Sequence, residues 1–194
     1  MTRRRPPFIP QRRPVYVGCE GESEVSYARF LEDLLCEAEL PVHLAVEKLG
    51  PGAGDPLARV DMAVRQLAHM RRTRIAPAER FVLLDFDQAE RDPQRADRAT
   101  RTAAENDIVI VWQRPCFEAV LLRHLQGRAA HRPLDASGAM RALIRNWPEY
   151  KKPMSRDTLA RRLDLAAVLR ATAVEPELDA LVKCLGLTPS VKGL

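Results

Sequence analysis

The sequence has no long hydrophobic run. Its longest apolar stretches, residues 81–84 and 108–112, have the length of buried strands and fall far short of the ~18 residues that indicate a membrane span. The arginines near the N-terminus are not followed by an apolar segment, so no secretory signal is predicted. We therefore expect a chain without a membrane partner.

Paired metal-binding or disulfide-forming cysteines are also missing. The four cysteines, at positions 19, 36, 116 and 184, lie far apart, with no C-x-x-C pair and no nearby histidine doublet. This spacing argues against a zinc site and against a disulfide scaffold, and it favours a reduced, cytoplasmic environment. The chain also has no G-x-x-x-x-G-K-[ST] loop of its own for binding nucleotide phosphates.

Acidic residues are absent from positions 1–14, which contain five arginines: Arg3, Arg4, Arg5, Arg12 and Arg13. Subtracting these 5 from the 31 basic residues leaves 26 against 26 acidic ones, so the net charge of +5 comes from this segment. Its prolines and lack of helical periodicity predict a disordered arm. Such an arm could follow a nucleic-acid backbone by counterion release, and the alternative is a solvated tail.

Strand and helix patterns alternate along most of the chain, which predicts an α/β fold. Four short apolar runs indicate strands: residues 15–19, 42–46, 81–84 and 108–112. Each run is followed by apolar residues at helical spacing, with Ser23, Asp55 and Asp92 as the expected N-caps of the first three helices.

Beyond residue 131 the pattern predicts helices alone. They are expected over residues 139–147, 157–171 and 176–185. The predicted organisation is a basic arm (1–14), a mostly parallel sheet flanked by helices (15–155) and an α-helical C-terminal extension (156–194).

Carboxylates directly follow two of the predicted strands. Glu20 comes after the first strand, and Asp85 and Asp87 come after the third. The carboxyl ends of parallel strands form the edge at which open α/β sheets bind ligands. Asp85 and Asp87 are two residues apart, so in extended backbone they point to the same side. Hard oxygen donors without histidine or cysteine suit Mg²⁺ or Mn²⁺, although each residue alone could be an ordinary strand-end polar group.

Two more charged features follow the fourth strand. Glu118 lies at the start of the next helix, again at a carboxyl end, and Lys151 and Lys152 follow a tryptophan-proline break. A lysine beside bound metal could offset negative charge on a transferred phosphoryl group. The alternatives are a favourable first-turn charge for Glu118 and a solvated pair for the lysines.

In this order, four motifs resemble those of the RloB-like proteins, a bacterial family associated with restriction and phage-resistance loci and with a Toprim-type fold. The motifs are E-G-E-S-E-V-S-Y at 20–27, D-F-D at 85–87, P-C-F-E at 115–118 and Y-K-K at 150–152. Ser23 stands where the family has threonine, and Gln113-Arg114 stands where relatives often carry Ser-Asn. The resemblance covers residues 16–152.

The resemblance implies a role for each matched residue. Glu20 would be a metal ligand or general base, Asp85 and Asp87 would be metal ligands, and Glu118 would serve a second metal position. Lys152 would stabilise charge, with Lys151 as the less favoured choice, and Arg114 would contact a phosphate. Glu24 would line the site or act as a first-turn charge, and Tyr27 would pack in the core.

These observations lead to three hypotheses of function. The first is a nuclease that uses Mg²⁺ or Mn²⁺ to cleave phosphodiester bonds in DNA, or in RNA, and that works in phage defence. The basic arm would bind the nucleic-acid backbone, and the resemblance implies a separately encoded ATPase as a partner. The second is a non-catalytic Toprim-like module that binds nucleic acid or that ATPase. The third is a haloacid-dehalogenase-like phosphatase with an aspartyl nucleophile, which the residues after Asp87 disfavour.

Overall fold

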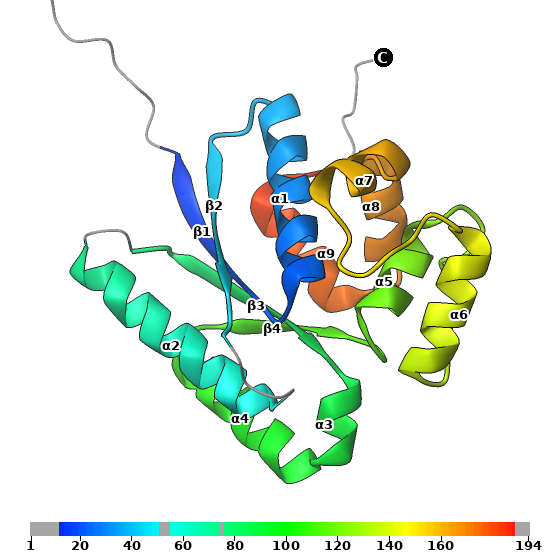
Figure 1. Cartoon of the computed structure of the whole chain (residues 1–194). Helices are drawn as coiled ribbons and strands as arrows, with labels where there is room; N and C mark the ends of the chain where they lie inside the picture. Colours follow the sequence, from blue (N-terminus) through cyan, green and yellow to red (C-terminus); the bar gives the residue numbers. More distant parts are fainter. Residues whose placement is uncertain (1–11, 51–54, 74–75, 189–194) are drawn as a thin grey trace, which may run out of the picture.

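The core of the protein is a sheet of four parallel strands (Figure 1). The computed structural model describes residues 12–50, 55–73 and 76–188. The strands are β1 (Arg13–Cys19), β2 (Val42–Lys48), β3 (Glu79–Asp85) and β4 (Val109–Gln113), in the order β2-β1-β3-β4. Every neighbouring pair in this order is parallel. The predicted α/β class is therefore confirmed, and the arrangement is consistent with a Toprim-like fold.

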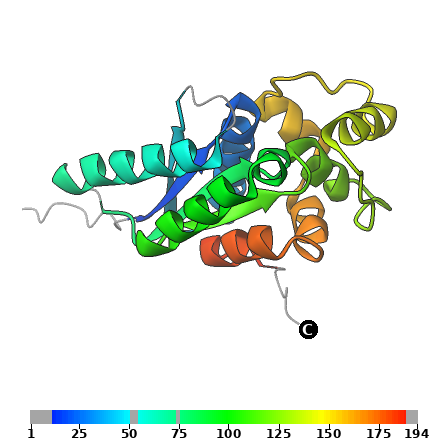
Figure 2. The same cartoon turned by 90° about the horizontal axis from the view of Figure 1, so that it is seen from below.

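Helices cover both faces of this sheet (Figures 1 and 2). They are α1 (Glu22–Glu37), α2 (Pro56–Arg72), α3 (Asp87–Arg91), α4 (Pro93–Glu105), α5 (Phe117–His124), α6 (Ala136–Asn146), α7 (Arg156–Arg162), α8 (Leu165–Thr172) and α9 (Pro176–Leu185). Alternation along β3 explains the two layers: Phe81 and Leu83 pack with α1 and α5, whereas Val82 and Leu84 pack with α2 and α4. Both faces of the strands are apolar, as a buried parallel sheet requires.

The predicted helix starts are correct for α2 and α4 and wrong for α1. Asp55 accepts a hydrogen bond from the backbone N–H of Leu57, and Asp92 accepts one from that of Arg95. In both helices proline follows the cap, where its missing N–H costs nothing. The first helix instead begins at Glu22 after Gly21, with no side-chain cap, and places Ser23 inside its first turn.

The C-terminal helices share a core with the sheet. Leu159, Val168 and Leu181 belong to the same buried cluster as Val17 of β1 and Leu31 of α1. The predicted helix over 157–171 is divided into α7 and α8, because Asp164 caps the second helix by accepting a hydrogen bond from Ala167 N–H. The short helix α3 was not predicted.

The predicted arm boundary at residue 14 needs correction. β1 begins at Arg13, whose backbone N–H donates to the carbonyl of Pro41 beside β2. Residues 1–11, including Arg3, Arg4 and Arg5, lie outside the described residues. In the described ranges, no helix combines the length and apolar character that crossing a membrane requires.

Candidate active site

The carboxyl edge of the sheet holds a cavity of about 390 Å³ with charged walls. Its lining comes from the β1–α1 turn, the first turn of α1, the end of β3, helix α2 and the segment before α7. The residues are Glu20, Gly21, Glu22, Ser23, Glu24, Arg59, Asp85, Lys152 and Pro153. Glu20, Asp85 and Lys152 were predicted as site residues, so three distant segments meet here as expected.

Glu20 ties the ends of two neighbouring strands together. Its Oε2 accepts a hydrogen bond from the backbone N–H of Asp85 at 3.1 Å. Its other oxygen, Oε1, lies 4.0 Å from Nη2 of Arg59. The carboxylate is thereby held at the wall of the cavity, with one oxygen turned to a cationic side chain.

Asp85 is a carboxyl group that this environment keeps from ionising easily. Its pKa is raised to about 8, first by burial and then by the negative charges of Glu24 and Glu20. One contact acts in the opposite direction: Oδ1 accepts a hydrogen bond from the backbone N–H of Phe117 at 2.7 Å. Asp85 thus connects the end of β3 to the start of α5.

Glu24 fulfils both roles that the sequence allowed. It lies in the first turn of α1 and lines the cavity, where it is only 4% exposed. Its pKa is raised to about 7, mainly by burial, with Glu20 and Glu118 adding to the effect and Lys152 opposing it. Two neighbouring carboxyl groups therefore have pKa values far above those of ordinary surface acids.

Glu118 has its charge neutralised by residues of the Y-K-K motif. Lys152 Nζ lies 2.8 Å from Glu118 Oε1, and the Tyr150 hydroxyl donates to the same oxygen at 2.9 Å. Burial acts to raise the pKa of Glu118, but the hydrogen bond and the positive charge of Lys152, together with hydrogen bonds from Cys116 and the backbone, outweigh it, so the pKa lies below its ordinary value. Lys152 remains half exposed and reaches the cavity.

Asp87 and Lys151 are not brought into the cavity. Extended backbone would have placed Asp87 on the same side as Asp85, but α3 begins at Asp87 and turns the chain. Asp87 lines a separate hollow with Arg91, whose Nη2 lies 3.8 Å from its carboxylate. Lys151 is exposed.

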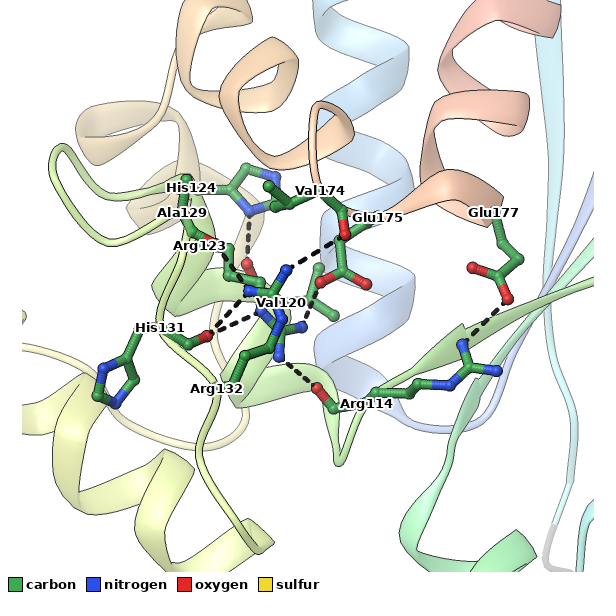
Figure 3. Close-up of polar contacts among 10 residues, drawn as sticks. All are labelled: Arg114, Val120, Arg123, His124, Ala129, His131, Arg132, Val174, Glu175 and Glu177. Carbon is green, nitrogen blue, oxygen red and sulfur yellow. Dashed lines mark hydrogen bonds and ion pairs between the residues drawn. The ribbon is translucent and has the colours of Figure 1, made fainter.

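The predicted nucleic-acid contacts are spread over the described surface. Arg114 lies over the ring of Phe86, 4.5 Å from its centroid, and pairs with Glu177 of α9 at 3.0 Å (Figure 3). Arg13 pairs with Glu79 at 2.6 Å at the amino end of β1, so it lies at the opposite end of the strand from Glu20. Arg12 is exposed and precedes β1.

A buried ion pair anchors the β4–α5 turn, which precedes the helix that carries Glu118 (Figure 3). Arg123 of α5 is 1% exposed, pairs with Glu175 before α9, and donates to the backbone carbonyls of Arg114 and His131. The C-terminal helices thereby hold the start of α5 in place.

Tyr27, predicted as a core residue, is buried and hydrogen-bonded to His124 at 2.8 Å.

Arg59 is a cavity residue that sequence reasoning missed. It comes from α2 and is 8% exposed, although arginine is almost never so buried without partners. Its Nη1 donates to the carbonyls of Leu49 and Gly50. No motif marks this position, and the only available signal is an arginine between the apolar residues Leu57 and Val60 of the helix.

The donor chemistry fits a hard divalent cation, but the side chains do not form a ready coordination sphere. Within residues 12–50, 55–73 and 76–188, no three His, Cys, Asp or Glu side chains are placed to hold one ion. Glu20, Glu24 and Asp85 nevertheless offer oxygen donors to one cavity. Burial raises the pKa of both Glu24 and Asp85, and neighbouring carboxylates add to the effect. Sharing an ion would require these side chains to rotate toward one another.

The chain was compared with protein-family models, with curated proteins and with solved structures, and none of them matches it. The resemblance to RloB-like proteins thus rests on the four motifs, and function is inferred from the residues that gather at this edge of the sheet.

Proposed function

We propose that the chain is a nuclease that hydrolyses phosphodiester bonds in DNA with the help of Mg²⁺ or Mn²⁺. The observation that carries this proposal is the convergence of Glu20, Glu24 and Asp85 on one cavity at the carboxyl edge of a parallel sheet. Burying Glu24 and Asp85, whose pKa values are raised, costs stability when they ionise, and a divalent cation would offset that cost. The motif resemblance to RloB-like proteins supports the same activity.

The carboxylates and the lysine of the cavity have different tasks in this reaction. Glu20, Glu24 and Asp85 would hold the ion, which when bound supplies a more acidic water and a polarised phosphate. Glu20, fixed by the Asp85 backbone N–H, has a second oxygen that can accept a proton from the attacking water. Lys152, held 2.8 Å from Glu118, can offset negative charge that develops on the phosphate.

A plasmid-nicking assay tests the activity. Purified protein is incubated with supercoiled plasmid and Mn²⁺ or Mg²⁺, beside Asp85→Asn and the matched control Asp87→Asn, which changes a carboxylate outside the cavity. We expect nicking by the wild type and the control and loss of at least about 100-fold in Asp85→Asn. Equal nicking by wild type and Asp85→Asn would show that this cavity is not the catalytic site.

Metal titration by calorimetry separates binding from cleavage. We expect Mn²⁺ to bind the wild type and the Asp87→Asn control, and binding to Asp85→Asn to be weakened about tenfold or more, because one carboxylate donor is lost. A wild type that binds no divalent ion contradicts the proposal.

One observation favours a second candidate, a non-catalytic module that binds nucleic acid. The carboxylate of Glu118 already has Lys152 and Tyr150 as partners. Within the described ranges, no three acidic, histidine or cysteine side chains are placed to hold one ion. A protein that binds plasmid DNA without nicking it in either metal would support this candidate against the nuclease.

A further inference from the structure

Two residues that line the cavity each carry a buried polar atom without a hydrogen-bond partner among the described residues. The two atoms are Oγ of Ser23, a residue that is 2% exposed, and Nε of Arg59, a residue that is 8% exposed. Buried polar atoms are bonded in the great majority of cases, so each exception calls for an explanation. Both residues line the same cavity, which suggests one explanation for both: a ligand that the cavity receives.

The guanidinium of Arg59 is held in place through Nη1, and its Nε–H has no acceptor among the described residues. Its Nη1 is occupied by the carbonyls of Leu49 and Gly50, and Nη2 faces Glu20 Oε1 at 4.0 Å. The planar group cannot rotate one nitrogen without moving the others, so Nε–H has a fixed direction. The carbonyls of the segment after β2 thus orient a cation that α2 delivers to the cavity.

The chemistry of these donors defines the missing partner. Arginine can only donate, and it cannot lose its charge in a protein, so the partner must offer acceptor oxygens and is best negatively charged. The serine hydroxyl comes from α1 and the guanidinium from α2, so the acceptor oxygens must reach two elements at once. A tetrahedral phosphate group, with several equivalent acceptor oxygens, meets this requirement.

We propose that Arg59 and Ser23 form the subsite that binds the phosphate of the substrate through its non-bridging oxygens. This inference rests on the proposed nuclease activity, because the phosphate of a phosphodiester is the ligand that this subsite would hold. Arg59 is then the residue that selects phosphate, and Lys152, already paired with Glu118, provides a second positive charge on the wall that precedes α7.

Three variants test this subsite. Arg59→Lys keeps a positive charge for the Leu49 and Gly50 carbonyls but removes the Nε donor, and Ser23→Ala removes the hydroxyl. Arg65→Lys is the matched control, since it makes the same change at an exposed position of the same helix. The measurements are KM and kcat for plasmid nicking, inhibition by inorganic phosphate, and Mn²⁺ affinity by calorimetry.

We expect Arg59→Lys to raise KM and the inhibition constant of phosphate about tenfold, because a charge-assisted hydrogen bond is lost. Ser23→Ala should raise both about fivefold. In the control Arg65→Lys, KM and the inhibition constant of phosphate should stay within about twofold of the wild-type values. The Mn²⁺ affinity of all three variants should also stay within about twofold of the wild-type value. Unchanged phosphate inhibition in Arg59→Lys overturns the inference while leaving the nuclease proposal intact.

The same variants and measurements also cover two other outcomes. If Arg59→Lys melts far below the wild type, Ser23→Ala carries the test, and unchanged phosphate inhibition in that variant overturns the inference. If the wild type neither nicks DNA nor binds Mn²⁺, the nuclease proposal fails. Calorimetry with inorganic phosphate alone then decides the subsite: binding weakened in Arg59→Lys supports it, and absence of binding to the wild type overturns it.

Discussion

Replacing Asp85 by asparagine should stabilise the protein at neutral pH. Asparagine keeps an oxygen that can accept the hydrogen bond from Phe117 N–H, which Asp85 accepts at 2.7 Å. It removes the ionisation that burial and the charges of Glu24 and Glu20 oppose. The variant therefore isolates the electrostatic cost of one carboxyl group with little change in shape.

The size and sign of this effect follow from the raised pKa. The pKa of Asp85 moves from its ordinary value of 3.8 to about 8, so between these pH values the folded protein binds more protons than the unfolded chain. The wild type must then lose stability as the pH rises through this window. At pH 7 the full cost is ~4 kcal/mol, and since solvent reaches part of the side chain we expect Asp85→Asn to gain about 2–4 kcal/mol.

Urea unfolding followed by circular dichroism at several pH values between 4 and 8 measures the gain. Asp85→Asn and wild type should be equally stable near pH 4, and their difference should grow toward pH 8. The control Asp87→Asn, which lies outside the cavity, should stay within about 0.5 kcal/mol of the wild type. An Asp85→Asn variant that is less stable than the wild type at pH 7, or a difference that does not vary with pH, refutes the reasoning.

Three other changes have expected outcomes. Lys152→Met removes the partner that holds the pKa of Glu118 below its ordinary value, so it should abolish nicking and lower the unfolding free energy above pH 5 by about 1–2 kcal/mol, measured by urea titration. Arg123→Met leaves Glu175 buried without its cation and should cost about 3–5 kcal/mol in the same assay, whereas a loss below about 1 kcal/mol would show that the pair is dispensable. Burial lowers the pKa of His124 to about 4, so the unfolded chain binds more protons between pH 4 and 6.5 and thermal stability should fall as the pH drops through that range. A His124→Gln variant should lose that slope, and an unchanged slope would assign it to other groups.

Local patterns predicted the helices and strands well, for a simple reason. Apolar runs such as β3, and caps such as Asp55 and Asp92, act within a few residues, so their effect is visible in the sequence. The errors have equally local causes. Ser23 lies inside α1 because the helix starts one residue before it, and α3 was missed because five residues are too short to show a period.

The candidate site was predictable only where strand ends determine it. Glu20 and Asp85 meet because Glu20 follows β1 and Asp85 ends β3, and these two parallel strands pair directly. Asp87 also lies near the end of β3, but it does not line the cavity. The chain becomes helical at Asp87, so side chains no longer alternate between the two sides of an extended strand.

The sequence by itself determined the parallel α/β sheet and the chemistry at its carboxyl edge, because alternating apolar runs and the carboxylates that follow them are local properties of the chain. Only the tertiary structure decided which charges meet. It pairs Lys152 with Glu118. It also brings Arg59 to the cavity wall from α2, which covers the sheet face opposite to that covered by α1. Such contacts depend on how separate helices pack, and the spacing of residues along the chain does not determine that packing.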